Sequence, residues 1–174
     1  KEFSKESRAM VYFYSAKRAS ESFDLTSGTQ EIGAWLKGDK AVFGATGEEI
    51  LDISQIRLKG EHNIYNVLAA ITAAKIANAP AKIINKAISE FNGLSGRLQL
   101  IRKIKEVVYV NDTTSTNPEA AIAAIKSFPE ENIILIAGGA DKNLDYAGLA
   151  EFLTQRNNVK KIILLPGEAT DKLS

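Results

Sequence analysis

The sequence contains no cysteine, so no disulfide and no thiolate can contribute to its fold or its chemistry. It also lacks an apolar run of the ~18 residues that a membrane-spanning helix needs, and its charged start, KEFSKESRAM, has no apolar core of the kind that a signal peptide carries. Neither sign of charge predominates, with 22 basic and 21 acidic residues. These absences disfavour nucleic acid and membranes as partners and are typical of a cytoplasmic protein.

What is present indicates a globular chain. An apolar fraction of 45% over 174 residues is enough for one large domain or two small ones. The chain does not begin with Met, and its final stretch, GEATDKLS, stops where a helical pattern begins. We therefore expect a piece of a longer protein, with a complete small protein as the alternative.

Residues 1–92 predict a β-rich part followed by two helices. MVYFYS has the aromatic and β-branched residues of a strand, and EIGAWLKGDKAVFG predicts two strands that turn at Gly38 and Asp39. EEILDISQIRLKG predicts one or two further short strands. The apolar spacing then predicts a helix over residues 63–78 and a second helix over residues 81–91, with Pro80 between them.

Residues 93–98, within FNGLSGRLQ, form the best candidate for a linker because two glycines and a serine lie close together. Beyond it, LQLIRKIKEVVYVND predicts two strands, NPEAAIAAIKSF a helix, NIILIAGG a buried strand, YAGLAEFLTQRN a helix and VKKIILLPG another buried strand. This alternation predicts an α/β layer with parallel strands over residues 99–174.

The stretch VVYVNDTTSTNPEAA places polar side chains where a predicted buried strand ends and a helix begins. Asp112 and Thr116 lie in this turn, Asn117 is a suitable N-cap, and Pro118 suits the first helical position. Open α/β sheets bind ligands at such turns, and helix starts bind anions. The alternative is a capped turn with a solvated threonine cluster, and this motif alone favours that alternative.

The stretch NIILIAGGADKNLDY brings a lysine to a second turn of this kind. Gly138 and Gly139 permit a close approach of the backbone, and Lys142 is expected at the same sheet edge as Thr116. A lysine there can bind a carboxylate or a phosphate as a point charge. An exposed loop lysine is the commoner case.

Arg97 follows the flexible linker, where a guanidinium fork can hold phosphate oxygens. A surface arginine with no ligand is again the commoner case. The pattern G-x-x-x-x-G-K-[ST] does not occur in the chain, so no loop of that type can hold a nucleotide's phosphates.

The predicted helix that starts in GEHNIYNVLAA opens with His62, Asn63 and Asn66. At helical spacing Asn66 neighbours both other residues. An asparagine offers a donor and an acceptor, which matches the edge of a base such as adenine. Helix capping is the alternative, and it explains one such residue but not three.

Taken in order, these stretches resemble one family. GEHNIYNVLAA is similar to the G-x-HN-x-x-N-x-x-AA signature of the Mur ligases and folylpolyglutamate synthetases, and FNGLSGR resembles the linker between their central and C-terminal domains. NDTTSTN and GGADKNLDY resemble the subgroup that adds D-glutamate. The resemblance starts near Gln30. It implies an α/β chain, with the end of a central ATPase domain over residues 1–92 and a truncated Rossmann-like C-terminal domain over residues 99–174.

The resemblance implies an ATP-dependent amide ligase of peptidoglycan synthesis that acts as a cytoplasmic monomer. ATP would phosphorylate the carboxylate of UDP-N-acetylmuramoyl-L-alanine, and the amine of D-glutamate would attack the acyl phosphate. Mg²⁺ is required in the family. The family's P-loop and magnesium ligands lie upstream of the matched region, so the resemblance assigns no metal ligand to this chain and implies that the chain alone is inactive.

The resemblance also implies roles for individual residues. Asn63 and Asn66 would contact adenine, Asp112 the ribose, and Arg97 the phosphates of ATP. His62 matches the signature but receives no chemical role.

Two residues would hold the amino-acid substrate. Thr116 and Lys142 match the positions that bind D-glutamate, where a lysine and a helix start offer countercharge to its two carboxylates. Together with Arg97, which would contact the phosphates of ATP, Lys142 is predicted to be catalytic.

Two positions depart from the family pattern, and two other functions stay open. The residue before the linker arginine is usually His and is Gly96 here, and the family's NDSKATN has a lysine where this chain has Thr114. A folylpolyglutamate synthetase-like ligase is the second enzymatic interpretation. A non-catalytic, ligase-like binding domain is the third, and the two departures are its support.

Overall fold

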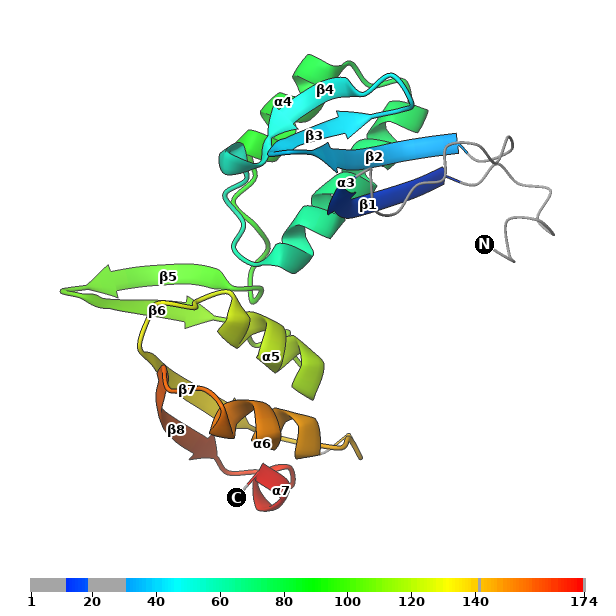
Figure 1. The fold of residues 1–174 in the computed structure, drawn as a ribbon. Helices are drawn as coiled ribbons and strands as arrows, with labels where there is room; N and C mark the ends of the chain where they lie inside the picture. The colour runs from blue at the N-terminus through cyan, green and yellow to red at the C-terminus, as the bar shows by residue number, and fades with distance from the viewer. Residues whose placement is uncertain (1–11, 19–30, 141, 174) are drawn as a thin grey trace. The chain divides into compact units, whose positions relative to one another are not determined.

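The structure is a computed structural model that describes residues 12–18, 31–140 and 142–173. The chain divides into two compact units, Lys1–Asn92 and Gly93–Ser174 (Figure 1). Within the described residues, no helix combines the length and the apolar character needed to cross a bilayer.

The first unit contains a four-stranded sheet in the order β1-β2-β3-β4. The strands are β1 (Tyr12–Arg18), β2 (Glu31–Lys37), β3 (Lys40–Phe43) and β4 (Glu48–Asp52). β1 runs parallel to β2, and the other two neighbouring pairs are antiparallel. The start of the predicted first strand, at Met10 and Val11, lies outside the described residues.

The predicted hairpin is confirmed. Lys37 pairs with Lys40, and Gly38 and Asp39 form the turn between β2 and β3. Gly38 has a φ of 62°, which a residue without a Cβ adopts at little cost. The local signal was sufficient here because a tight turn is determined by the residues within it.

Two helices lie against this sheet. α3 (Glu61–Ile76) packs on β1 and β2, and α4 (Ala81–Glu90) packs on β4 (Figure 1). Their apolar faces and the sheet enclose one core, which consists of Ala34, Leu36, Ala41, Ile50, Leu51, Val67, Leu68, Ile71 and Ile84. Both predicted helices are thus present, but α3 begins at Glu61 with Gly60 as N-cap, two residues earlier than predicted.

Of the one or two short strands predicted in EEILDISQIRLKG, the structure contains one, β4. Ile53–Gln55 instead form a 3-10 turn, η1, because Asp52 caps it. The Asp52 carboxylate accepts a hydrogen bond from Ser54 N, and the Asp52 N–H donates to Gln55 Oε1. These reciprocal bonds form a capping box, which favours a helical turn over an extended chain.

A buried threonine links α3 to β2. Thr72 Oγ1 accepts a hydrogen bond from Ala34 N at 2.8 Å and donates one to Leu68 O at 2.8 Å. A Cβ on the adjacent Gly33 would lie 2.6 Å from Phe13 O and 2.7 Å from Thr72 Cγ2. Helix and sheet can therefore approach this closely only because residue 33 has no side chain and residue 72 has a hydroxyl group.

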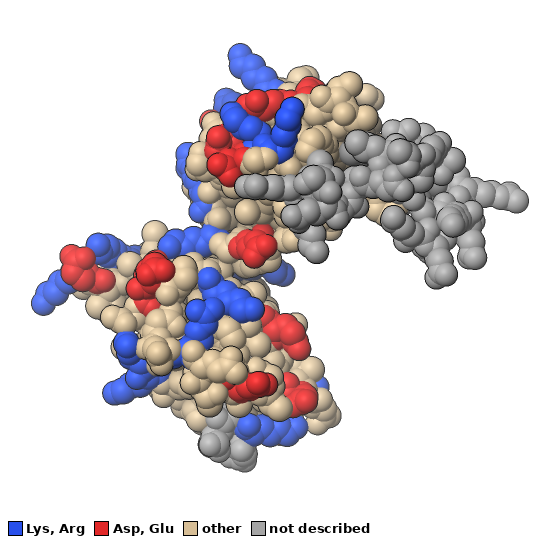
Figure 2. Space-filling view, viewed as in Figure 1, with Lys and Arg blue, Asp and Glu red and all other residues tan. Residues whose placement is uncertain are grey.

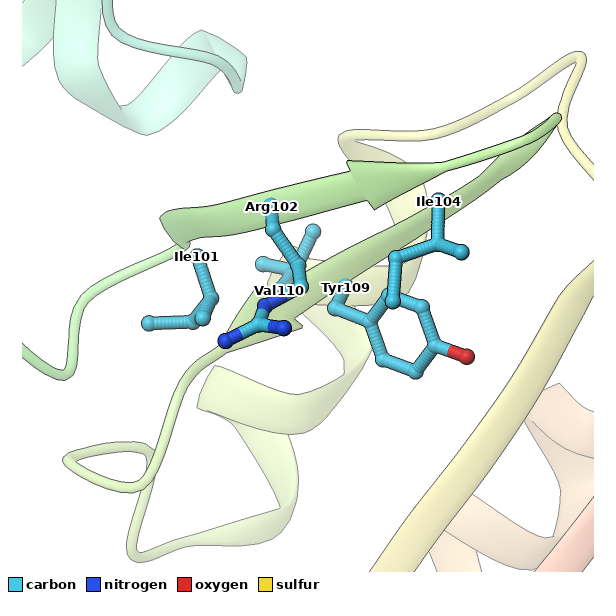
Figure 3. Close-up of a pocket in the computed structure, with 5 residues that line it drawn as sticks. All are labelled: Ile101, Arg102, Ile104, Tyr109 and Val110. Carbon is cyan, nitrogen blue, oxygen red and sulfur yellow. The ribbon is translucent and has the colours of Figure 1, made fainter.

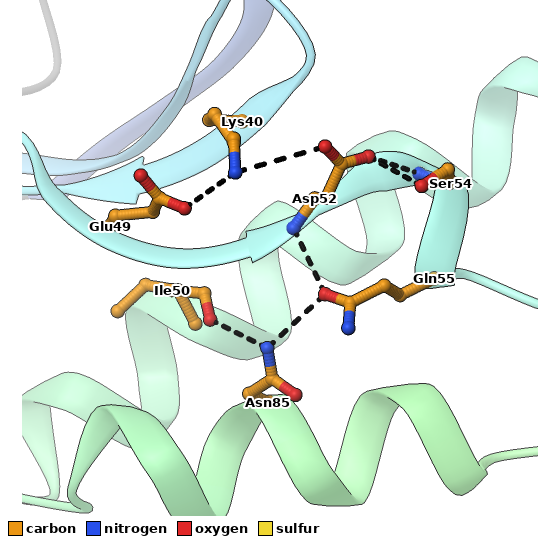
Figure 4. Close-up of polar contacts among 7 residues, drawn as sticks. All are labelled: Lys40, Glu49, Ile50, Asp52, Ser54, Gln55 and Asn85. Carbon is orange, nitrogen blue, oxygen red and sulfur yellow. Dashed lines mark hydrogen bonds and ion pairs between the residues drawn. The ribbon is translucent and has the colours of Figure 1, made fainter.

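A polar network at the end of β4 joins the sheet, η1 and α4 (Figure 4). Lys40 Nζ lies 2.7 Å from Glu49 Oε1 and 3.8 Å from Asp52 Oδ2. From α4, Asn85 Nδ2 donates to Ile50 O at 2.9 Å and to Gln55 Oε1 at 3.3 Å. The hydrogen bond with Glu49 raises the pKa of Lys40, and the hydrogen bonds from Ser54 lower the pKa of Asp52.

In the residues that the structure describes, the second unit contains two small sheets and three helices. Its first sheet is an antiparallel hairpin, and its second is a pair of parallel strands. The elements in chain order are β5 (Gln99–Ile104), β6 (Val107–Asn111), α5 (Pro118–Lys126), β7 (Ile133–Gly138), α6 (Ala147–Thr154), β8 (Val159–Leu165) and α7 (Thr170–Leu173). The predicted strand–helix alternation and the parallel pairing of β7 with β8 are confirmed, and the mixed α/β fold class with them.

The predicted burial of three strands in this unit is wrong. Val107 in β6 is 54% exposed, Ile134 in β7 is 61% exposed, and Ile163 in β8 is 43% exposed. A strand is buried on both faces only where packed layers cover both, and the described residues supply no such pair of layers to β6, β7 or β8. Their apolar composition was therefore an unreliable signal of burial within this chain.

Replacing Thr72 with Val should destabilise the first unit. The change keeps the side-chain shape but leaves the buried Ala34 N–H without its partner, which should lower the free energy of unfolding by about 1–3 kcal/mol. Thr72→Ser keeps the hydroxyl and should cost less. Urea titration followed by the fluorescence of Trp35, the chain's one tryptophan, measures this directly. Equal stability of Thr72→Val and the wild type would contradict the role of the hydroxyl.

Asp52 should make the stability of the first unit depend on acid pH. Its pKa is lower in the folded state, so its carboxylate stabilises the fold above the unfolded pKa and loses that contribution as pH falls through the folded pKa. Asp52→Asn preserves a good N-cap but does not titrate. Between about pH 5 and pH 2 the wild type should lose more stability than this variant. Glu90→Gln removes another exposed carboxylate of the first unit and is the charge control. An equal loss of stability by the wild type and by Asp52→Asn over this pH range would contradict the expectation.

Candidate functional site

The start of α3 presents two asparagines that are bonded to each other. Asn66 Nδ2 donates to Asn63 Oδ1 at 3.2 Å, and Asn63 Nδ2 donates to Lys59 O at 2.7 Å. Gly60 is the N-cap, and no side chain caps the helix. Asn63 Oδ1 accepts from Asn66 and not from a backbone N–H of the first turn. The bond between the two side chains uses one hydrogen of Asn66 Nδ2 and leaves that amide's Oδ1 unused.

Asn66 can therefore still offer a donor and an acceptor side by side. Its side chain is exposed, as is that of His62 in the same helical turn. A planar group with one acceptor and one donor on its edge, such as adenine, fits this amide. The structure thus brings Asn63 and Asn66 together as predicted and adds the hydrogen bond that orients Asn66.

In the second unit, Asp112 is held at the end of β6. Its Oδ1 accepts a hydrogen bond from Leu98 N at 2.9 Å, and its Oδ2 accepts one from Ser115 Oγ at 2.5 Å. Each carboxylate oxygen can accept a further bond, so a ligand hydroxyl can share this side chain. Asp112 is partly buried, whereas Arg97, beside Leu98, is exposed.

Gly96 and Thr114, the two residues that depart from the family pattern, contact each other. Thr114 donates to Gly96 O from its backbone N at 3.0 Å and from its Oγ1 at 2.7 Å. A Cβ on Gly96 would lie 3.1 Å from Thr114 Cγ2. This pairing is not evident from the sequence, because no local pattern indicates which side chain meets a buried glycine 18 residues away.

Thr116 lies directly before α5. Asn117 is the N-cap, and its Oδ1 accepts a hydrogen bond from Ala120 N at 2.7 Å, with Pro118 in the first turn as predicted. The predicted cap is therefore confirmed, and Thr116 is exposed next to it. Ala120 N and Ala121 N are bonded to Asn117, and Pro118 has no N–H. An anion at this position would therefore meet the N–H of Glu119 at the helix start.

Lys142 follows β7 and is exposed. The expectation that it shares a sheet edge with Thr116 is wrong, because β6 and β7 belong to different sheets in the described residues. The glycines before Lys142 do allow close approaches: a Cβ on Gly138 would lie 2.6 Å from Leu165 O, and Ala169 N donates to Gly139 O at 3.1 Å. These glycines therefore fix the turn against β8 and the segment that follows it.

A hollow of about 450 Å³ lies on the hairpin of the second unit (Figure 3). Its lining consists of Ile101, Arg102, Ile104, Tyr109 and Val110, all exposed. None of the predicted site residues lines it. The residues that carry polar chemistry therefore lie elsewhere, at the starts of α3 and α5 and in the turn after β7.

Neither charge nor metal ligands concentrate at these positions. On the face drawn in Figure 2, basic and acidic side chains are interspersed over each unit. Among the residues that the structure describes, no three His, Cys, Asp or Glu side chains form a group that could hold a metal ion. The described residues thus do not fit a magnesium site.

No protein-family model matches the chain, but curated proteins do. The UDP-N-acetylmuramoylalanine--D-glutamate ligase of Bdellovibrio bacteriovorus is 35% identical over 172 residues, which cover 96% of this chain and 35% of that protein. The enzyme of the same name from Oenococcus oeni is 36% identical over 99% of this chain and 35% of its own length. That of Roseiflexus sp. is 45% identical over 68% of this chain and 25% of its own length.

The chain therefore spans about a third or less of the length of these relatives. Among solved structures, that of MurF from Acinetobacter baumannii aligns with 78% of this chain and 36% of its own, at 19% identity and a TM-score of 0.49. The identities to the Bdellovibrio and Oenococcus enzymes rest on nearly all of the chain and confirm the resemblance found in its motifs. On this ground the chain belongs to the Mur ligase family, as a segment similar to the D-glutamate ligases.

Proposed function

We propose that this chain is part of an ATP-dependent ligase that joins D-glutamate to UDP-N-acetylmuramoyl-L-alanine in peptidoglycan synthesis. The supporting observation is 35–36% identity to D-glutamate ligases over 96–99% of the chain. In this proposal residues 1–92 are the end of the central ATP-binding domain, residues 93–98 the linker, and residues 99–174 a truncated, Rossmann-like C-terminal domain. The enzyme would work as a monomer in the cytoplasm.

The first unit would bind the base of ATP. The hydrogen bond from Asn66 Nδ2 to Asn63 Oδ1 fixes the plane of the Asn66 amide before a ligand arrives. An amide held in this way loses less rotational freedom on binding, so a base edge with complementary groups binds more tightly. ATP, as substrate, supplies the phosphoryl group that activates the acceptor's carboxylate.

The second unit would bind the remainder of ATP and the amino acid. Asp112 would accept from the ribose hydroxyls while it holds Leu98 N, and Arg97 would reach the phosphates. Lys142 and Thr116 would hold the carboxylates of D-glutamate, the first by its charge and the second beside the capped start of α5. D-glutamate would thus be oriented with its amine free to attack.

Mg²⁺ belongs to the proposed reaction but not to the described residues. They offer no cluster of three ligating side chains. The contribution of this chain is to bind and orient the two substrates.

The proposal is tested with the full-length ligase that contains this sequence. ADP release should require UDP-N-acetylmuramoyl-L-alanine and D-glutamate together, and L-glutamate or a folate acceptor should not replace them. The 174-residue chain alone should release no phosphate. Activity with folate and L-glutamate, or no nucleotide binding by the full-length protein, would overturn the proposal in favour of the synthetase or the binding domain.

Lys142→Ala in the full-length ligase should raise the KM for D-glutamate by about ten- to a hundredfold, because hydrogen bonds to charged groups are worth roughly 1.5–3 kcal/mol. The KM for ATP should change little. Lys161→Ala removes another exposed lysine of the same unit and serves as the matched control. Steady-state kinetics with each substrate varied in turn gives both constants. A similar rise in both KM values would contradict the assignment of Lys142 to D-glutamate.

A further inference from the structure

We propose that Thr114 is a positioning residue that, with Asp112, fixes the backbone on both sides of Arg97 and so directs the Arg97 side chain. The proposal rests on the assignment of Arg97 to ATP under the proposed function. It adds a role for a residue that touches neither substrate in that scheme. All contacts involved lie within the second unit.

The backbone before Arg97 is held by Thr114. Gly96 O accepts two hydrogen bonds from this one residue, at 3.0 Å from the backbone N and at 2.7 Å from Oγ1. Gly96 is buried, and its φ of 75° is one that a glycine adopts without strain. The carbonyl that precedes Arg97 therefore has a defined direction.

The backbone after Arg97 is held by Asp112. Leu98 N donates to Asp112 Oδ1 at 2.9 Å, and Ser115 Oγ donates to the other carboxylate oxygen at 2.5 Å. A charged acceptor makes the bond to Leu98 stronger than one between neutral groups. Leu98 keeps a φ of 42°, in the left-handed region that residues with a Cβ seldom occupy.

Two further bonds complete the turn. Gly96 N donates to Gln99 Oε1 at 3.0 Å, and Arg97 N donates to Leu94 O at 3.2 Å. Both polar groups of Gly96 and the N–H groups of the next two residues are thus bonded. We name residues 96–98, together with Asp112 and Thr114, the arginine clamp.

The clamp determines the placement of a side chain that packing does not hold. Arg97 is exposed, so neighbouring side chains do not enclose its guanidinium. The bonds at Gly96 and Leu98 set the direction in which its Cα–Cβ bond leaves the backbone, and with it the region that the guanidinium can reach through its staggered rotamers. A small displacement of a group that contacts a transferred phosphate lowers the rate strongly.

The first experiment is a double-mutant cycle in the full-length ligase. Thr114→Val removes the Oγ1 donor and keeps the shape, so kcat/KM for ATP should fall about three- to tenfold, the effect of one hydrogen bond. Thr114→Ser should restore most of the activity. Thr113→Val, the neighbouring change of the same kind, is the matched control and should leave activity unchanged.

The cycle separates positioning from general stability. If Thr114 acts through Arg97, Thr114→Val should cost nothing further in an Arg97→Ala background. Equal costs in both backgrounds would overturn the clamp while leaving the proposed function intact. If Arg97→Ala has no effect, the assignment of Arg97 to ATP fails instead, and a second measurement decides the clamp.

That measurement is trypsin cleavage after Arg97 in the full-length ligase. The clamp protects the Arg97–Leu98 bond, because a protease must first open the local structure. Thr114→Val should accelerate cleavage there about three- to tenfold, with little change at Arg102 in β5. Thr113→Val should change neither site. Equal acceleration of cleavage at Arg97 and Arg102, or no acceleration at either site, would overturn the clamp.

Discussion

The first unit depends on how closely α3 can approach β2. At Gly33 a side chain would clash with the helix and with the neighbouring strand, and at Thr72 a hydroxyl satisfies the strand N–H that this approach would otherwise bury unpaired. The same hydroxyl also bonds Leu68 O within the helix. The Thr72 hydroxyl thereby holds α3 in position on the sheet. The polar start of the same helix, with Asn63 and Asn66, is positioned with it.

The second unit is organised differently. Its strands expose much of their apolar surface, and only three of its described aliphatic residues, all outside the strands, are buried: Ile125, Leu149 and Ala169. Order near Arg97 and Asp112 comes instead from short-range hydrogen bonds between the linker and the turn after β6. The proposed ligand contacts of the two units thus rest on a packed core in one and on a hydrogen-bonded turn in the other.

The sequence predicted what local interactions decide. The hairpin at Gly38, the cap at Asn117 and the two helices of the first unit were found because their signals lie within a few residues of one another. Burial of Val107 and Ile134 was predicted wrongly, since burial depends on which layers pack on a strand and not on the strand's composition. The prediction that Thr116 and Lys142 share a sheet edge was wrong for a similar reason, because it required β6 and β7 to belong to one sheet.

The contact between Gly96 and Thr114 has a consequence for how this sequence can diverge. A side chain at position 96 would press on the Thr114 methyl group at 3.1 Å and would have to adopt a positive φ. Thr113 Oγ1 lies 3.2 Å from the same Cβ position. A lineage that gains a side chain at position 96 is therefore expected to change this threonine pair as well, and the order of the substitutions decides whether the intermediate still holds its arginine in place.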